Sequence, residues 1–176
     1  EKFVQEQRAW AQTNLKPKAT PTDWLGLSAP TRYIRIVHNP LERFQKTPHI
    51  LAEISEAVKN AQTEVIAQSP YIIINNPMKR LIPTELKAKL TILTNSAAVS
   101  PNLFAVSGYT NARKDLVKLG SVYEYQGNGS LHGKSYIIDK HLSIVGTFNL
   151  DPRSAYLSTE SMVMIESEEF AAVMTK

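Results

Sequence analysis

Short apolar runs of strand length recur along the chain from residue 31 onward, and helical patterns of apolar residues separate the first four of them. Runs that alternate between apolar and polar positions, or that are rich in β-branched and aromatic residues, predict strands. We expect strands over residues 33–37, 64–67, 89–94, 122–125, 132–139, 142–149 and 161–165. Strands that alternate with helices and then follow one another directly are typical of an α/β fold with a mixed β-sheet flanked by helices.

The helices between these strands are predicted from spacing and end signals. Apolar residues recur at helical spacing after Pro48, which favours the first turn of a helix, and Thr47 is the expected N-cap residue. A longer helix is predicted over residues 103–119, because Gly120 follows it where glycine commonly ends a helix. A short helix is also expected over residues 78–86.

The two ends of the chain differ from the middle. The first 30 residues contain Pro17, Pro21 and Pro30 and show no apolar pattern that would build a core layer. We interpret residues 1–30 as an arm or a linker between repeats, and residues 31–176 as one domain. The chain does not begin with Met, has no apolar stretch of a signal peptide and closes on what resembles an unfinished helix. We therefore expect a fragment of a longer protein.

Composition supports a packed globular domain. Of the 176 residues, 43% are hydrophobic and 20% are charged, and the formal net charge is +4. These proportions argue against a disordered chain, a collagen-like fibre or a coiled coil. The absence of cysteine excludes disulfides, thiolate zinc sites and a cysteine nucleophile. No apolar run approaches the about 20 residues that a transmembrane helix requires, so we expect none in this chain.

One segment concentrates polar residues whose chemistry suits a phosphodiester. It begins at His132 and reads H-x-K-x4-D-x6-G-T-x-N. Side chains two apart on a strand share a face, so His132 and Lys134 point the same way, as do Thr147 and Asn149 on the neighbouring strand. An imidazole can attack phosphorus, while an ammonium and an amide N–H can hold the non-bridging oxygens. This chemistry needs no metal ion and no cofactor.

The pattern resembles the signature of the phospholipase D superfamily, a histidine-lysine-aspartate motif followed by a glycine-serine-x-asparagine segment. Further segments are similar to its cardiolipin synthase-like, phosphatidyltransferase branch, namely Leu131–Lys134, Gly146–Ala155, Ser158–Glu160, Leu93–Ser96, Gly108-Tyr109 and Arg113-Lys114. The resemblance covers roughly residues 33–169. It implies a phospholipase D-like α-β-α sandwich that forms one repeat of a normally two-repeat enzyme.

The resemblance also implies roles for the polar residues of the motif. His132 is expected to be a nucleophile or an acid at phosphorus, and Lys134 and Asn149 are expected to grip the phosphate. Glu160 stands where the family has a carboxylate that orients a catalytic histidine, either His132 or the histidine of a partner motif. Thr147 takes the place of the usual serine and keeps its hydroxyl for substrate binding.

Two other residues of the motif are expected to be structural. Strand alternation places Asp139 on the face opposite the histidine and the lysine. Gly146 opens the glycine-threonine-x-asparagine segment.

A basic region surrounds the longer predicted helix. Residues 78–118 contain seven Lys or Arg against two Asp or Glu, an excess of five positive charges. Tyr109 and Arg113 lie four residues apart and share a helix face, so we expect both to border the substrate pocket. A solvated surface is the ordinary explanation for the remaining charges. The alternative is that they steer an anionic substrate or dock on acidic lipid headgroups.

The chain holds one copy of the motif, whereas the resemblance implies an active site built from two. One histidine would form the phosphohistidine and the other would protonate the leaving alcohol. His38, His49 and His141 cannot supply the second copy, because none is followed two residues later by lysine. The second motif is expected from an N-terminal half of a longer enzyme, which we favour, or from a symmetric homodimer.

Three functions follow from this interpretation. The favoured one is phosphatidyl transfer or phospholipid hydrolysis through a phosphohistidine, by a protein associated peripherally with a membrane. The second is a single-motif homodimeric endonuclease, although a net charge of +4 is modest for a partner of nucleic acid. The third is an isolated half-domain that is inactive without its partner motif.

Overall fold

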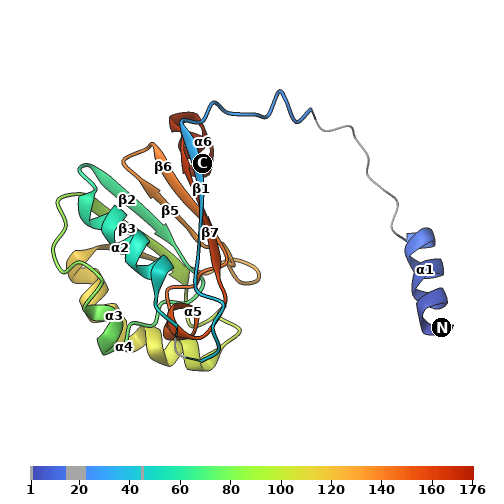
Figure 1. Cartoon of the computed structure of the whole chain (residues 1–176). Helices are drawn as coiled ribbons and strands as arrows, with labels where there is room; N and C mark the ends of the chain where they lie inside the picture. The colour runs from blue at the N-terminus through green and yellow to red at the C-terminus, as the bar shows by residue number, and fades with distance from the viewer. Residues whose placement is uncertain (1, 15–22, 45) are drawn as a thin grey trace.

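Seven strands in the described residues form one mixed sheet in the order β1-β7-β6-β5-β2-β3-β4 (Figure 1). The structure is a computed structural model, and it describes residues 2–14, 23–44 and 46–176. β2, β3 and β4 are parallel, whereas the pairs β2–β5, β5–β6, β6–β7 and β7–β1 are antiparallel. The predicted α/β class with a mixed sheet is confirmed. The strands are β1 (Tyr33–His38), β2 (Glu64–Gln68), β3 (Lys89–Asn95), β4 (Gly120–Tyr125), β5 (Ser135–Ile138), β6 (Leu142–Gly146) and β7 (Ser161–Glu166).

Helices α2 (His49–Asn60), α3 (Asn76–Lys79), α4 (Leu103–Leu119), α5 (Pro152–Tyr156) and α6 (Glu168–Met174) flank this sheet. A further helix, α1 (Lys2–Asn14), precedes them in the chain. α2 packs against β1 and α5, α4 against β4, and α6 against β6. The helix predicted over residues 103–119 is confirmed as α4. Its N-cap is Asn102, whose side-chain oxygen accepts hydrogen bonds from the backbone N–H groups of Phe104 and Ala105.

Two helix predictions were wrong in detail. The N-cap of α2 is Pro48 rather than Thr47, and no side chain from this position caps the helix. The backbone N–H of Ile50 instead donates to the side-chain oxygen of Asn39. α3 covers only four residues of the chain and does not extend over residues 78–86, because that range contains Pro83, which lacks an N–H and disrupts a helix.

One face of the sheet builds the core together with α2 and α4. Because side chains alternate along each strand, the same face of neighbouring strands supplies the buried residues. The core joins Val65, Leu90, Ile92, Tyr136, Ile138, Ile144, Met162 and Met164 from the sheet to Ile50, Leu51, Ile54, Tyr109, Ala112 and Leu116 from the helices. This shared core holds the strand ends in fixed positions.

Strand direction brings several loops to one edge of the sheet, which we call the site edge. β1, β2, β3, β4 and β6 end at this edge, and β5 and β7 begin there. Ligands commonly bind outside the carboxyl ends of parallel strands. The loops that meet at the site edge are residues 39–48, 69–75, 96–102, 126–134, 147–151 and 157–160.

The two central strands of the motif are shorter than predicted. β5 begins only at Ser135 and β6 ends at Gly146, so the polar residues lie in the flanking segments. The ladder stops there because the partner strand β2 ends at Gln68, opposite Ser135, and Pro70 has no N–H to continue it. The residues that move from strand to loop are His132, Lys134, Thr147 and Asn149.

The predicted arm falls only partly on the described residues. α1 covers its beginning, and residues 15–22 lie outside the described residues. Its division from the domain over residues 31–176 stays a prediction.

Candidate active site

Three neighbouring strands carry the polar residues of the motif to the site edge. His132 and Lys134 lie in the extended segment that enters β5, and Thr147 and Asn149 lie in the segment that leaves β6. Glu160 directly precedes β7. Because β5, β6 and β7 are adjacent in the sheet, these segments lie side by side at one edge.

His132 and Lys134 are in direct contact. The Lys134 ammonium lies 3.2 Å from Nδ1 and 3.3 Å from Nε2 of the His132 ring, and it donates a hydrogen bond of 2.8 Å to the His132 carbonyl oxygen. The imidazole is exposed, whereas Lys134 is only 8% exposed. The pair therefore combines a solvent-accessible imidazole with a buried positive charge beside it.

Two carboxylates act on that ammonium. Burial lowers the pKa of Lys134, and the negative charges of Glu160 and Asp151 act in the opposite direction and favour its charged form. Burial raises the pKa of Asp151, an effect that hydrogen bonds from Ser154 and Arg153 partly offset. The site thus places one lysine within the electrostatic influence of two acids.

Asp151 is a residue that the sequence interpretation missed. It is the N-cap of α5, and its carboxylate accepts a hydrogen bond of 2.7 Å from the backbone N–H of Ser154. The local signal was present, since an aspartate directly before Pro152 is typical of a helix start. Its nearness to Lys134 depends on the fold and has no local signal.

Asn149 sits on a firmly held segment. Phe148 beside it is fully buried, and the backbone N–H of Leu150 donates to the Ser69 hydroxyl at 3.1 Å. Within the described part of the chain, the side-chain oxygen of Asn149 is buried and has no hydrogen-bond partner. A buried amide oxygen without a partner is costly. Because this oxygen is an acceptor, only the amide N–H of Asn149 can bind a phosphate oxygen.

Thr147 and Gly146 join this segment to β7. The Thr147 hydroxyl accepts a hydrogen bond of 3.0 Å from the backbone N–H of Ser161. A Cβ added at Gly146 would collide with the Ser161 carbonyl oxygen and the Met162 backbone. The glycine therefore permits the close approach of β6 to β7. Glu160, the residue before Ser161, accepts a hydrogen bond of 3.3 Å from the Ser154 hydroxyl.

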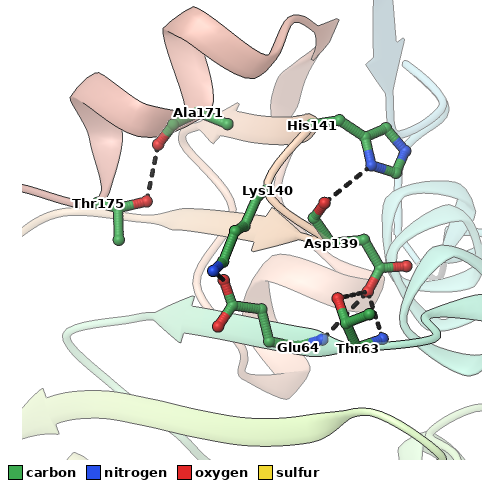
Figure 2. A network of polar contacts seen from close by, with 7 residues as sticks. All are labelled: Thr63, Glu64, Asp139, Lys140, His141, Ala171 and Thr175. Atoms are coloured by element: carbon green, nitrogen blue, oxygen red, sulfur yellow. Dashed lines mark hydrogen bonds and ion pairs between the residues drawn. The ribbon is translucent and has the colours of Figure 1, made fainter.

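Asp139 lies at the other end of β5 and contacts the start of β2 (Figure 2). Its carboxylate accepts hydrogen bonds from the backbone N–H groups of Gln62, Thr63 and Glu64 and from the Thr63 hydroxyl. Burial alone raises the pKa of Asp139, but these hydrogen bonds outweigh it and lower the pKa to about 2. Asp139 and Lys140 both have positive φ, 49° and 60°, as a tight type I′ hairpin turn requires. These contacts support a structural role.

Asn95, at the end of β3, braces the segment that carries the histidine. Its side-chain amide donates to the carbonyl oxygen of Leu131 at 2.9 Å and to that of Pro70 at 3.3 Å, and its oxygen accepts from the N–H of Leu131 at 2.8 Å. Asn95 is 4% exposed. Asn95 belongs to the segment Leu93–Ser96, which is similar to the family, but nothing in the sequence indicates this role.

Tyr109 and Arg113 share one carboxylate. The Tyr109 hydroxyl and the Arg113 Nε each donate a hydrogen bond of 2.7 Å to Glu124. Burial and the Glu124 hydrogen bond raise the pKa of Tyr109 to about 12. Tyr109 also lines a small cavity with Asn95 and Tyr71. Tyr109 thus lies near Asn95, which holds the segment of His132. In the described residues, no hydrogen bond or ion pair joins Tyr109 or Arg113 to His132.

The arrangement suits chemistry at a phosphate group. It offers an exposed imidazole, a fixed ammonium and a side-chain amide, and in the described residues no three His, Asp or Glu side chains converge as metal ligands. Such groups can attack phosphorus and hold its oxygens.

The larger part of the chain matches a protein-family model. The family model described as "Cardiolipin synthase, PLD-like domain" matches residues 54–176.

Curated relatives are longer than this chain. An uncharacterized protein of Helicobacter pylori strain 26695 is 33% identical over 132 residues, which cover 66% of this chain and 26% of that protein. Cardiolipin synthase C of Escherichia coli K12 is 37% identical over 106 residues, 50% of this chain and 22% of the synthase. The chain spans about a quarter of the length of such relatives.

Solved structures share the fold at low sequence identity. Nuc from Salmonella typhimurium, described as a phospholipase D family member, superposes with a TM-score of 0.60 at 11% identity, over 81% of this chain and 89% of Nuc. Phosphatidylserine synthase from Haemophilus influenzae superposes with a TM-score of 0.59 at 14% identity, over 81% of this chain and 37% of the synthase.

Proposed function

Because this chain belongs to the cardiolipin synthase, PLD-like domain family of the phospholipase D superfamily, we propose that it acts on the phosphodiester of an anionic phospholipid. The reaction is hydrolysis or transfer of the phosphatidyl group to an alcohol. The observation that carries this proposal is the contact between the exposed His132 imidazole and the buried Lys134 ammonium at the site edge.

The proposed reaction has two steps and uses two histidines. In the first step, one imidazole nitrogen attacks phosphorus, a P–N bond forms, and the P–O bond to the leaving alcohol breaks as the second histidine donates a proton to that oxygen. In the second step, the second histidine takes a proton from water or an acceptor alcohol, which attacks phosphorus, and the P–N bond breaks. His132 supplies one of these two roles.

The surrounding residues hold the phosphate and the imidazole. Lys134 and Asn149 bind the non-bridging oxygens as negative charge develops on them. Thr147 contributes a hydroxyl beside them, and Glu160 orients a catalytic histidine, His132 or the one of the second motif. Tyr109 and Arg113, fixed on Glu124, line the approach of the substrate.

The second histidine comes from a second motif. We favour one that lies elsewhere in a longer polypeptide, and a homodimer of this chain is the other arrangement. An incomplete site is supported by the exposed apolar side chains around the site edge, where a covering partner would bury them. These side chains are Leu41, Phe44, Leu103, Phe104 and Leu157.

The basic region over residues 78–118 supports an anionic lipid substrate and peripheral membrane association. In the described residues, Lys79, Lys118 and Arg113 already pair with Asp115 or Glu124, so the remaining lysines and arginines provide the net charge. Attraction of this kind to acidic headgroups weakens as salt is added. No helix in the described part of the chain is long and apolar enough to cross a membrane.

A homodimeric endonuclease is the second candidate function. The observation that favours it is that one copy of this fold covers 89% of Nuc but only 37% of the phosphatidylserine synthase. A single repeat therefore forms most of Nuc, which is compatible with a site completed by a second copy.

The experiment that separates these functions uses two substrates. The full-length protein is incubated with phosphatidylglycerol vesicles and, in parallel, with plasmid DNA, each with and without EDTA. The proposal predicts new lipid products in both vesicle reactions and intact plasmid. Plasmid nicking without lipid turnover would support the endonuclease instead. Activity in the full-length protein that is lost in the isolated 176-residue chain would support a half-domain that does not react without its partner motif.

A further inference from the structure

Asn39 is fully buried at the end of β1 and is bonded to a segment far away in the sequence. Its backbone N–H donates to the carbonyl oxygen of Glu160 at 3.0 Å. Its side-chain amide donates to the carbonyl oxygens of Ser154 at 2.7 Å and Ser158 at 3.3 Å, and its side-chain oxygen accepts from the N–H of Ile50 at 3.3 Å. One side chain thus ties the start of α2 to the loop between α5 and β7.

Lys46 makes a second connection to the same loop. Its backbone N–H donates to the carbonyl oxygen of Tyr156 at 2.8 Å, and its ammonium donates to the Thr159 hydroxyl at 2.8 Å and to the Pro40 carbonyl oxygen. The side chain is 6% exposed. Among the described residues, no carboxylate forms an ion pair with this ammonium.

A buried ammonium bonded to neutral oxygens is unusual, because removing a charge from water costs free energy that an ion pair normally offsets. A protein that retains such a group commonly does so at a functional site. Here the Pro40 oxygen belongs to the loop that also carries Lys46, and the Thr159 oxygen belongs to a second loop at the site edge, residues 157–160. Lys46 therefore fixes one loop against the other rather than filling space in the core.

The loop that Lys46 and Asn39 hold is the one that carries Glu160. Thr159, which accepts from Lys46, is the residue before Glu160, and the Glu160 backbone itself accepts from Asn39. The Glu160 carboxylate contacts the Ser154 hydroxyl and acts electrostatically on Lys134. The position of that carboxylate thus depends on contacts made from the far side of the loop.

We propose that Asn39 and Lys46 are positioning residues that hold Glu160 at the correct distance from the reacting groups of the site. Both precede residue 54, where the family match begins, so the match gives neither residue a role. The inference rests on the proposed function, because it assumes that Glu160 takes part in the phosphodiester reaction. Neither residue contacts the phosphate, and each acts through Glu160.

A double-mutant cycle tests this dependence. Lys46→Met removes the charge and the hydrogen bonds while keeping an unbranched apolar side chain, Glu160→Gln removes the carboxylate, and Lys59→Met on the exposed end of α2 is the matched control. In the full-length protein we expect Lys46→Met to lower kcat about tenfold with little change in KM. In the Glu160→Gln background the same change should cost less than about twofold, because residues that act as a unit are not additive.

Several outcomes would overturn the proposal. Equal losses in both backgrounds would mean that Lys46 acts independently of Glu160, and unchanged kcat in Lys46→Met would remove its role. Lys46→Arg, which keeps the charge and the donors, should restore most of the activity. If Lys46→Met fails to fold, Thr159→Ala removes one of the two acceptors of the ammonium, the one in the loop that carries Glu160, and should lower kcat in the same direction.

Hydrogen exchange separates this inference from the proposed function. If the full-length protein turns over no phosphodiester, the proposed function is wrong. The contacts of the loop over residues 157–160 can still be measured in that protein. We expect faster amide exchange in peptides covering residues 157–160 in Lys46→Met, and wild-type exchange in Lys59→Met. Wild-type exchange in Lys46→Met would contradict the positioning role whatever the activity.

Discussion

At the scale of single residues, the motif divides into groups that face the site edge and one group that stabilises the fold. His132 and Lys134 contact each other just before β5 begins. Asp139 follows the end of β5 and accepts hydrogen bonds from three backbone N–H groups there. The same short motif therefore serves both chemistry and stability, and the two uses can be separated by substitution.

The Asp139 contacts predict a pH dependence of stability. The folded-state pKa of about 2 lies below the ordinary value of 3.8, so the stabilisation is complete above about pH 4 and is lost as the pH falls towards 2. After discounting for solvent screening, we expect it to be worth about 1–2 kcal/mol.

Asp139→Asn is the substitution that checks this, because asparagine also tolerates positive φ. Urea unfolding at pH 7 and pH 2.5 should show that the variant is less stable than the wild type at pH 7 and that the difference narrows at the lower pH. A difference that stays constant across this range would contradict the assignment.

The proposed site residues could be located from the sequence because their signal is local. The spacing from His132 to Asn149 can be read along the chain, and strand alternation predicts a structural role for Asp139. Asn39, Lys46 and Asp151 contact partners whose proximity depends on which strands pair. No local pattern in a single sequence reveals those contacts.

At the scale of elements, the ends of the strands position the site. Periodicity predicted the strands and the α4 helix, but not that β5 would pair with β2 on one side and β6 on the other. That pairing brings the segment before β5 next to the end of β3, where Asn95 holds Leu131 through two hydrogen bonds. The residues are 36 positions apart, so this brace is a product of sheet order.

The brace predicts a loss of both stability and activity in Asn95→Ala. The change leaves the part-buried N–H and carbonyl groups of Leu131 without their partner, which costs about 1–3 kcal/mol. It also frees the segment that places His132, so we expect kcat to fall by about tenfold or more. Thermal unfolding and steady-state kinetics measure the two effects.

Asn128→Ala is the matched control, since Asn128 is exposed in the loop before the motif. It should leave both quantities near the wild-type values. Full activity in Asn95→Ala would show that the segment holds its position without the brace.

At the scale of the whole molecule, the site has one histidine motif and an exposed apolar rim at the site edge. The fold was predictable from sequence because the alternation of strands and helices extends over the chain. The partner of the site edge was not, because no local pattern in one chain specifies which surface covers it.

The favoured arrangement predicts how this chain behaves alone. The 19.7 kDa chain should elute as a monomer over a range of concentrations and should turn over substrate only when a second motif is joined to it. Size-exclusion chromatography with light scattering, followed by the vesicle and plasmid assays, measures this. A concentration-independent dimer with activity of its own would favour the homodimer.

The central claim is that His132 reacts at phosphorus. It is tested most directly by the turnover rate of His132→Ala in the full-length protein, on whichever substrate the wild type consumes. His49→Ala, which removes an exposed imidazole at the start of α2, is the control. We predict a loss of about a thousandfold or more in His132→Ala, with a wild-type melting temperature and wild-type turnover in the control. A folded His132→Ala variant that keeps most of its activity would contradict the account.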